Sequence, residues 1–172
     1  MSDAALILID FQEQWLDPKS DYFVGDIAKI LEKVNRLIQF ARKQGLKIIF
    51  TRHIEQDSKT DFAPNSKGVE IISLLHKDKK DTLITKYRIN PFYQTKLEQE
   101  LVGVTKVVVA GILTNLCVRS FVEAAYDRDF AITVIADCCV AFDQKTQDFT
   151  IQDLKNTREE IQFMDLEEYY AR

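Results

Sequence analysis

The feature that most constrains the fold is a change of hydrophobic period within residues 106–137. An unbroken apolar, β-branched run at 107–109 is typical of a strand that is buried on both faces of a sheet. Beyond Gly111 the apolar residues recur at i, i+3, i+4 and i+7, at Val118, Phe121, Val122 and Ala125. That spacing describes one face of a helix. The segment therefore predicts a buried parallel strand that is followed directly by a helix.

Apolar runs and helical patterns alternate along the rest of the chain. Further strands are predicted at residues 4–9, 47–51, 81–86, 131–136 and 160–164, and further helices at 26–44, 69–75, 92–101 and 146–154. Asp26 and Gly45 suit the two ends of the first of these helices. The alternation predicts an α/β fold with a parallel sheet covered on both faces, a three-layer α/β/α domain spanning residues 1–172. Residues 52–67 are polar and aperiodic, and we expect them to form a loop over the edge where residues 4–9 end.

Composition and charge exclude several classes of function. A chain of 172 residues with 46% hydrophobic residues and a net charge of -4 is typical of a globular protein and disfavours a nucleic-acid partner. Three cysteines without regular spacing form neither a disulfide framework nor a CxxC pair. The N-terminal apolar run is too short for a signal peptide or a membrane span, so we expect a cytoplasmic protein without a membrane partner.

Three residues with chemically useful side chains stand at the ends of predicted strands. Asp10 follows the first strand, Lys86 ends the third, and Cys117 begins the helix after the strand at 107–109. The carboxyl ends of parallel strands share one edge, which is where open α/β sheets bind ligands. A cysteine in the first turn of a helix lies near the positive end of the helix dipole, which predicts a lowered pKa and a thiolate.

Together these residues suit acyl transfer through a covalent intermediate. Cys117 is the candidate nucleophile, Asp10 can take and return its proton, and the Lys86 ammonium can balance the local charge. Backbone N–H groups in the turn at 111–117 are candidates to stabilise the developing oxyanion. Taken singly, each residue also has an ordinary explanation, since a free cysteine often only fills space in a core. The conjunction predicts hydrolysis through a thioester.

Four segments carry a resemblance to a known family. They are LILIDFQ at 6–12, TK at 85–86 with FYQTKL at 92–97, GILTNLCV at 111–118, and the later Asp137. Along nearly its whole length the chain resembles the isochorismatase-like cysteine hydrolases. The resemblance implies a Rossmann-like, six-stranded parallel sheet and a catalytic triad of Asp10, Lys86 and Cys117.

The resemblance also implies features that residue patterns alone do not reveal. One is a cis peptide bond between Ile112 and Leu113, with the backbone N–H groups of Leu113 and Cys117 forming the oxyanion hole. Another is a homodimer or larger assembly, which the apolar stretch at 121–126 and the aromatic tail at 169–170 also favour.

The expected metal content and reaction differ from those of two groups within the family. Nicotinamidases of this family hold a metal with an aspartate and histidines after the second strand, whereas this chain has a lone His53 there. We therefore expect no metal and no other cofactor. Isochorismatases proper lack the nucleophilic cysteine, so Cys117 disfavours cleavage of a vinyl ether.

The expected substrate is a small molecule, either a planar amide or a ureido compound. Trp15, Tyr87, Phe92 and Asn115 flank the triad in sequence and are expected to line a small pocket with aromatic rings and a few polar groups. Arg88 is a candidate anchor for a substrate carboxylate. Two alternatives remain: a non-catalytic family member that serves as a ligand-binding or oligomerisation module, and a nicotinamidase that lacks the usual metal ligands.

Overall fold

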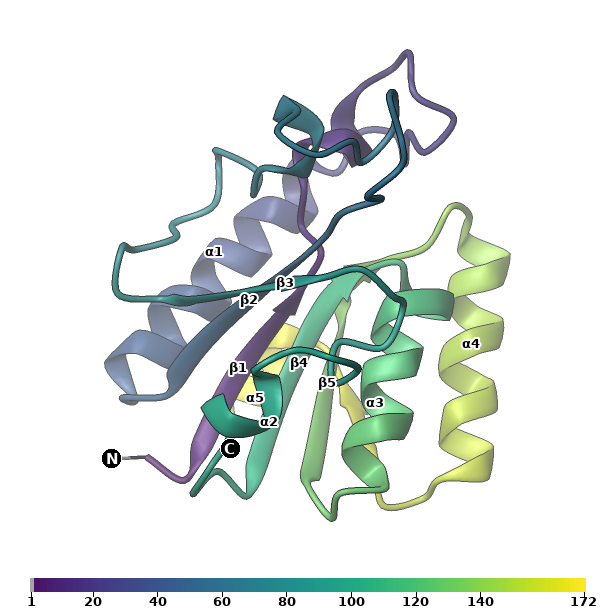
Figure 1. The fold of residues 1–172 in the computed structure, drawn as a ribbon. Helices are drawn as coiled ribbons and strands as arrows, with labels where there is room; N and C mark the ends of the chain where they lie inside the picture. Colours follow the sequence, from purple (N-terminus) through teal and green to yellow (C-terminus); the bar gives the residue numbers. More distant parts are fainter. Residues whose placement is uncertain (1) are drawn as a thin grey trace.

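The computed structural model describes residues 2–172 and contains a six-stranded sheet in which all neighbouring strands run parallel (Figure 1). The strands are β1 (Ala4–Ile9), β2 (Lys47–His53), β3 (Thr82–Lys86), β4 (Lys106–Ile112), β5 (Ala131–Val140) and β6 (Gln162–Met164). Their order across the sheet is β3-β2-β1-β4-β5-β6. The predicted parallel sheet is confirmed, and β1 and β4, which end beside two of the candidate site residues, are neighbours at its centre.

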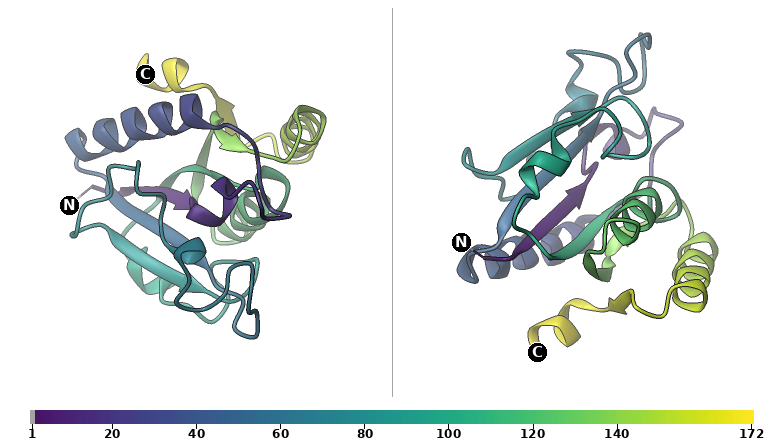
Figure 2. Two further views of the ribbon diagram at one scale, coloured as in Figure 1. Left: turned by 90° about the horizontal axis from the view of Figure 1, so that it is seen from above. Right: turned by 60° about the horizontal axis from the view of Figure 1, so that its bottom comes forward.

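Helices cover both faces of the sheet. They are α1 (Ala28–Lys43), α2 (Leu97–Glu100), α3 (Arg119–Tyr126), α4 (Gln144–Thr157) and α5 (Leu166–Tyr170). In the views of Figures 1 and 2, α1 and α5 lie on one face and α2 and α3 on the other, which confirms the three layers. Within residues 2–172 the structure has no helix that is both long and apolar enough to cross a membrane.

Strand β1 shows why the sheet needs cover on two sides. Its side chains alternate between two hydrophobic clusters, with Leu6 and Leu8 facing α1 and with Ala5, Ile7 and Ile9 on the side of α3. All five are fully buried. Since successive side chains of a strand point to opposite faces, an unbroken apolar run of this kind is stable only between two layers.

The long helix α1 begins and ends close to the predicted residues. The Asp26 carboxylate accepts a hydrogen bond from the backbone N–H of Ala28 at 2.9 Å. Gly45 follows the C-cap with a φ of 71°, a left-handed conformation that glycine adopts without steric cost. Local capping signals therefore located this element in the sequence.

Three predicted elements differ from the structure. Residues 69–75 do not form a helix, because the 3-10 turn Lys67–Val69 ends there and Ile71 instead forms an isolated antiparallel bridge with Gln12. Of the helix predicted at 92–101, only Leu97–Glu100 is helical. Strand β5 continues through Asp137 to Val140, past an irregular register with β4.

The two sequence hints of an assembly are accounted for within one chain. Phe121, Val122 and Ala125 of α3 pack into the core, and the rings of Tyr169 and Tyr170 contact Phe40 of α1. The homodimer or larger assembly therefore stays a prediction. Sedimentation at micromolar concentration tests it, and a single 19.9 kDa species would contradict it.

The carboxyl edge of the sheet lies beneath two long connections. Residues 10–27, which include the 3-10 turn Glu13–Leu16, and residues 54–69 rise above this edge at the top of Figure 1, and residues 70–81 then run back to the start of β3. The register pairs Ile9 with Gly111 and His53 with Lys86, so β1, β3 and β4 deliver their last residues to the same region. A pocket can form between the strand ends and these connections.

Candidate active site

Asp10 lies directly after β1, fully buried and held by contacts on every side. Its φ of 50° is left-handed, and its carbonyl oxygen accepts a hydrogen bond from the Trp15 indole Nε1 at 2.7 Å. Its backbone N–H donates to Thr51 Oγ1 at 3.1 Å, and that hydroxyl donates to Asp10 Oδ1 at 2.6 Å. The second carboxylate oxygen, Oδ2, lies 2.7 Å from Lys86 Nζ. Backbone and carboxylate are thus both fixed.

Lys86 reaches this carboxylate from the end of β3, across the end of β2. Its side chain is fully buried, and Nζ lies 3.5 Å from Cys117 Sγ and 3.2 Å from the carbonyl oxygen of Arg88. Burial disfavours the charge, but the carboxylate of Asp10 and the sulfur of Cys117 outweigh burial and raise the pKa of Lys86. The residue is therefore an ammonium at neutral pH.

Cys117 lies in the π-helical turn Thr114–Val118 that joins β4 to α3. The wide turn is closed by the Val118 N–H, which donates to the Leu113 carbonyl at 3.1 Å, and the peptide bond between Ile112 and Leu113 is cis. At Gly111, a β-carbon would stand 2.5 Å from Cβ of Ile9. Glycine therefore lets the end of β4 approach β1, which brings the sulfur close to the end of β1.

The thiol of Cys117 is held in its neutral form, contrary to the expectation from the helix dipole. Burial and then the Asp10 carboxylate raise the pKa of Cys117 to about 12, and the Lys86 ammonium only partly opposes them. The dipole argument failed because the side chain lies 7% exposed beside a buried anion. Formation of the thiolate requires that a neighbouring base takes the proton, and Asp10 is that neighbour.

A pocket of about 290 Å³ opens onto Asp10 and Cys117, and Lys86 lies buried behind them. It is lined by Asp10, Trp15, Tyr22, His53, Glu55, Phe62, Tyr87, Arg88, Ile89, Leu116 and Cys117. A larger polar hollow of about 800 Å³, between the connections above the sheet, contains none of the three. The small pocket is therefore the one that joins solvent to the candidate nucleophile.

The structure places two of the four expected substrate-binding residues at this pocket. Trp15 and Tyr87 line it. Phe92 instead stacks on Phe121 at 5.5 Å in the core beneath α3, because the chain turns inward after β3 and starts no helix at that point. Asn115 is exposed and outside the lining, since the π-helical turn presents Leu116 to the pocket in its place.

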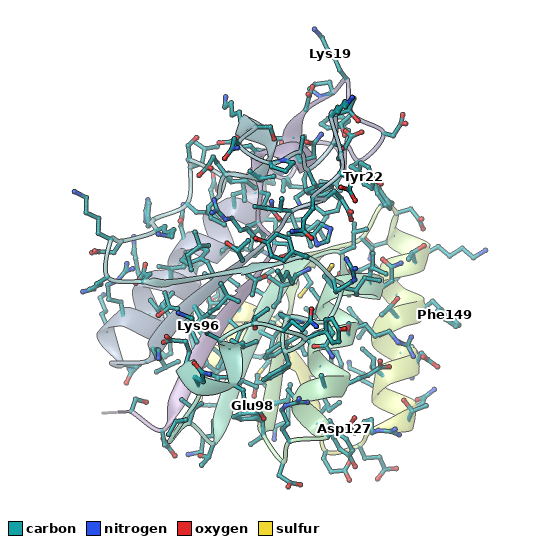
Figure 3. All side chains as sticks on the ribbon, in the orientation of Figure 1. Lys19, Tyr22, Lys96, Glu98, Asp127 and Phe149 are labelled. Atoms are coloured by element: carbon teal, nitrogen blue, oxygen red, sulfur yellow. The ribbon has the colours of Figure 1, made fainter. Side chains whose placement is uncertain are left out.

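Sequence reasoning missed the residues that enter the pocket from the two connections. Tyr22 and Phe62 pack edge to face at 5.2 Å, and Phe62 does the same with Trp15 at 5.0 Å. Tyr22 stands above the carboxyl edge of the sheet, at the opposite end of the molecule from Glu98 and Asp127 (Figure 3). The predicted position of the 52–67 loop over this edge is confirmed, but loop patterns do not show which side chains point inward.

The residues at the family's metal position do not form a metal site. His53 and Glu55 line the pocket, and Nε2 of the imidazole lies 2.6 Å from Oε1 of the carboxylate. Within residues 2–172 the structure shows no group of three or more histidine, cysteine or acidic side chains arranged to hold a metal ion. Protein zinc sites use three or four such ligands. The donor set therefore does not fit the metal that nicotinamidases of the family carry.

Cys138, Cys139 and Asp137 serve the fold. Cys138 and Cys139 are buried, free thiols, and burial raises the pKa of each. Asp137 forms an ion pair with Lys33 at 2.8 Å and accepts from the Leu166 N–H at 2.9 Å, which ties α1 and α5 to the sheet. Its place in the family pattern is therefore structural here.

Comparisons with known proteins agree with this fold. The model of the isochorismatase domain matches residues 4–165. The chain is 28% identical over 149 residues to an isochorismatase family protein of Bacillus subtilis, YddQ, covering 84% of this chain and 81% of the relative. It is 29% identical over 174 residues to a probable inactive nicotinamidase of Arabidopsis thaliana, covering 90% and 89%. An isochorismatase-like hydrolase of Alkaliphilus metalliredigens superposes with a TM-score of 0.89 at 17% identity, covering 99% and 98%. The chain therefore belongs to the isochorismatase family of hydrolases.

Proposed function

We propose that the chain is a cysteine hydrolase that cleaves the C–N bond of a small amide or ureido compound through a thioester. The observation that carries the proposal is the buried cluster at the base of the pocket. Lys86 Nζ lies 2.7 Å from Asp10 Oδ2 and 3.5 Å from Cys117 Sγ, and the side chains of Asp10 and Lys86 are fully buried. Burial of three titratable groups costs stability, so their presence together favours a purpose beyond folding.

In the first half of the reaction, the Cys117 sulfur attacks the substrate carbonyl as its proton passes to Asp10. The C–N bond then breaks, and the protonated Asp10 returns the proton to the leaving nitrogen, which departs as ammonia or an amine. The acyl group remains on sulfur as a thioester. A neutral resting thiol suits this order, because the nucleophile forms only when a substrate is present to accept its electrons.

In the second half, water hydrolyses the thioester. Asp10 takes a proton from the attacking water, the C–S bond breaks, and the proton returns to sulfur as the acid product leaves. Lys86 keeps its ammonium close to both anions as charge moves between them. We propose that the backbone N–H groups of Leu113 and Cys117 donate hydrogen bonds to the oxyanion of each tetrahedral intermediate.

The size and lining of the pocket favour a small planar substrate. A volume of about 290 Å³ is near the lower end of ligand pockets and is bordered by the rings of Trp15, Phe62 and Tyr87. Arg88 adds a guanidinium at the rim, where it donates to the Tyr87 carbonyl at 2.7 Å. Primary amides and N-carbamoyl compounds, with or without a carboxylate, match this space better than peptides.

A second candidate function is a non-catalytic ligand-binding module. The raised pKa of Cys117, about 12, favours it, because a resting thiolate is absent. So does the similarity to a probable inactive nicotinamidase. The intact cluster of Asp10, Lys86 and Cys117 argues against it, since a binding module gains nothing from a buried base beside a thiol.

A hydrolysis screen separates the two. Released ammonia is measured over small primary amides, N-carbamoyl acids and nicotinamide, with Cys117→Ala as the inactive control and Cys138→Ala as a matched control that removes a buried thiol elsewhere. We expect ammonia from at least one compound with the unaltered chain and Cys138→Ala, and none with Cys117→Ala. Cleavage of esters or peptides but no small amide would overturn the substrate class, and equal rates in Cys117→Ala would overturn the mechanism.

A further inference from the structure

Thr51, in the middle of β2, makes two hydrogen bonds to Asp10 and is itself fully buried. Its Oγ1 accepts the Asp10 backbone N–H at 3.1 Å and donates to Asp10 Oδ1 at 2.6 Å. A threonine hydroxyl has a single proton. Since the N–H group can only donate, that proton is directed to Oδ1 whenever the carboxylate is ionised. The two contacts therefore fix the direction of the hydroxyl and occupy one carboxylate oxygen.

The other oxygen, Oδ2, is arranged differently. Lys86 Nζ lies 2.7 Å from Oδ2 and forms an ion pair with it. Cys117 lies on this side, because its Sγ is 3.5 Å from the same Nζ. Each carboxylate oxygen has two lone pairs, so Oδ2 keeps one on the side of the thiol, whereas Oδ1 is turned towards Thr51.

We infer that Thr51 is a positioning residue that holds the Asp10 carboxylate so that Oδ2, and not Oδ1, receives the proton of Cys117. The inference rests on the proposed function, in which that proton transfer starts the reaction. Without the hydroxyl, the carboxylate loses both its rotational restraint and a donor that stabilises its charged form. The base then no longer faces the thiol.

The test compares Thr51→Val, which keeps the β-branched shape and removes the hydroxyl, with Thr51→Ser, which keeps the hydroxyl. We expect kcat/KM of Thr51→Val to fall at least about tenfold, a part of the 10²–10⁴-fold that a positioned base contributes. The loss should appear in kcat with KM nearly unchanged, because Thr51 acts on the base and does not line the pocket. Thr51→Ser should restore the rate. If Thr51→Val does not fold, Thr51→Ala carries the same test.

A second readout does not depend on turnover. Crystal structures of the unaltered chain, Thr51→Val and Thr51→Ser show the direction of the Asp10 carboxylate. We expect the carboxylate to be rotated in Thr51→Val, so that Oδ2 moves away from Lys86 and Cys117, and to keep its direction in Thr51→Ser. If no compound is hydrolysed by the unaltered chain, the proposed function fails while these structures still decide whether the hydroxyl positions the carboxylate. An unchanged carboxylate in Thr51→Val, or equal impairment of both variants, would overturn the role of the Thr51 hydroxyl.

Discussion

Cys117 and Cys139 are alike by burial and different in their neighbours. They are 7% and 4% exposed, and burial is the largest cause that raises the pKa of each to about 12. Cys117 lies 3.5 Å from the Lys86 ammonium and lines a pocket together with Asp10. Cys139 instead pairs with Gly111 inside the sheet, just after the irregular register between β4 and β5. The comparison teaches that burial alone makes a thiol inert. A base that can remove the proton on demand is what distinguishes a candidate nucleophile.

The largest expected effect comes from removing each sulfur in turn. Cys117→Ala should lower turnover at least about 1,000-fold, because no thioester can form. Cys139→Ala should keep the rate within about twofold. Initial rates of ammonia release, with circular dichroism to verify folding, measure the difference. Equal losses in the two variants would remove the distinction between the thiols.

Removal of the carboxylate should separate reactivity of the thiol from catalysis. Asp10→Asn should abolish turnover, yet it removes an anion that raises the pKa of Cys117. That pKa should therefore fall from about 12, and alkylation of Cys117 by iodoacetamide at neutral pH should become severalfold faster. Mass spectrometry locates the label, with Cys138 and Cys139 as internal references. Slower or unchanged alkylation would mean that the carboxylate does not hold the thiol in its neutral form.

Removal of the ammonium should affect stability as well as activity. Lys86→Met leaves the Asp10 carboxylate buried without a cation, which should lower the free energy of unfolding by about 3–5 kcal/mol. Lys33→Met breaks the Lys33–Asp137 pair, whose side chains are 43% and 25% exposed, and should cost under about 1 kcal/mol. Urea titrations compare the two. Similar losses would show that the Lys86–Asp10 ion pair contributes little to the free energy of unfolding.

The smallest expected effect is that of metal removal. His53 and Glu55 alone cannot form the usual three- or four-ligand zinc site, so a chelator should leave ammonia release unchanged. Metal content of the protein purified without added metal is measured in parallel. Stoichiometric zinc or iron together with loss of activity in the chelator would contradict this expectation, and would assign His53 a role in metal binding.

Much of the fold could be predicted because its signals are local. The apolar runs that became β1 and β4, the capping signals of Asp26 and Gly45, and the stripe on α3 each lie within a few residues. The meeting of strand ends at one edge follows from their parallel direction.

The details of the site depend on contacts between distant segments. The Thr51 hydroxyl meets a residue 41 positions away, and the inward turn of Phe92 depends on the ring of Phe121. The pKa of Cys117 could not be predicted either, because burial and the carboxylate oppose the helix dipole and neither is visible in the local sequence. Sequence patterns predicted that Asp10, Lys86 and Cys117 lie together, and tertiary contacts raise the pKa of the Cys117 thiol.

The place of β3 in the sheet has a consequence for how the protein loses its site. Lys86 comes from β3, an edge strand paired only with β2, whereas β1 and β4, which lead to the other two residues, are central. Edge strands open locally at lower free energy than central ones. Amide hydrogens of β3 should therefore exchange with deuterium before those of β1 and β4. On heating, we expect the ammonium to leave the cluster while most of the molecule is still folded, so the proposed activity should be lost before the sheet melts.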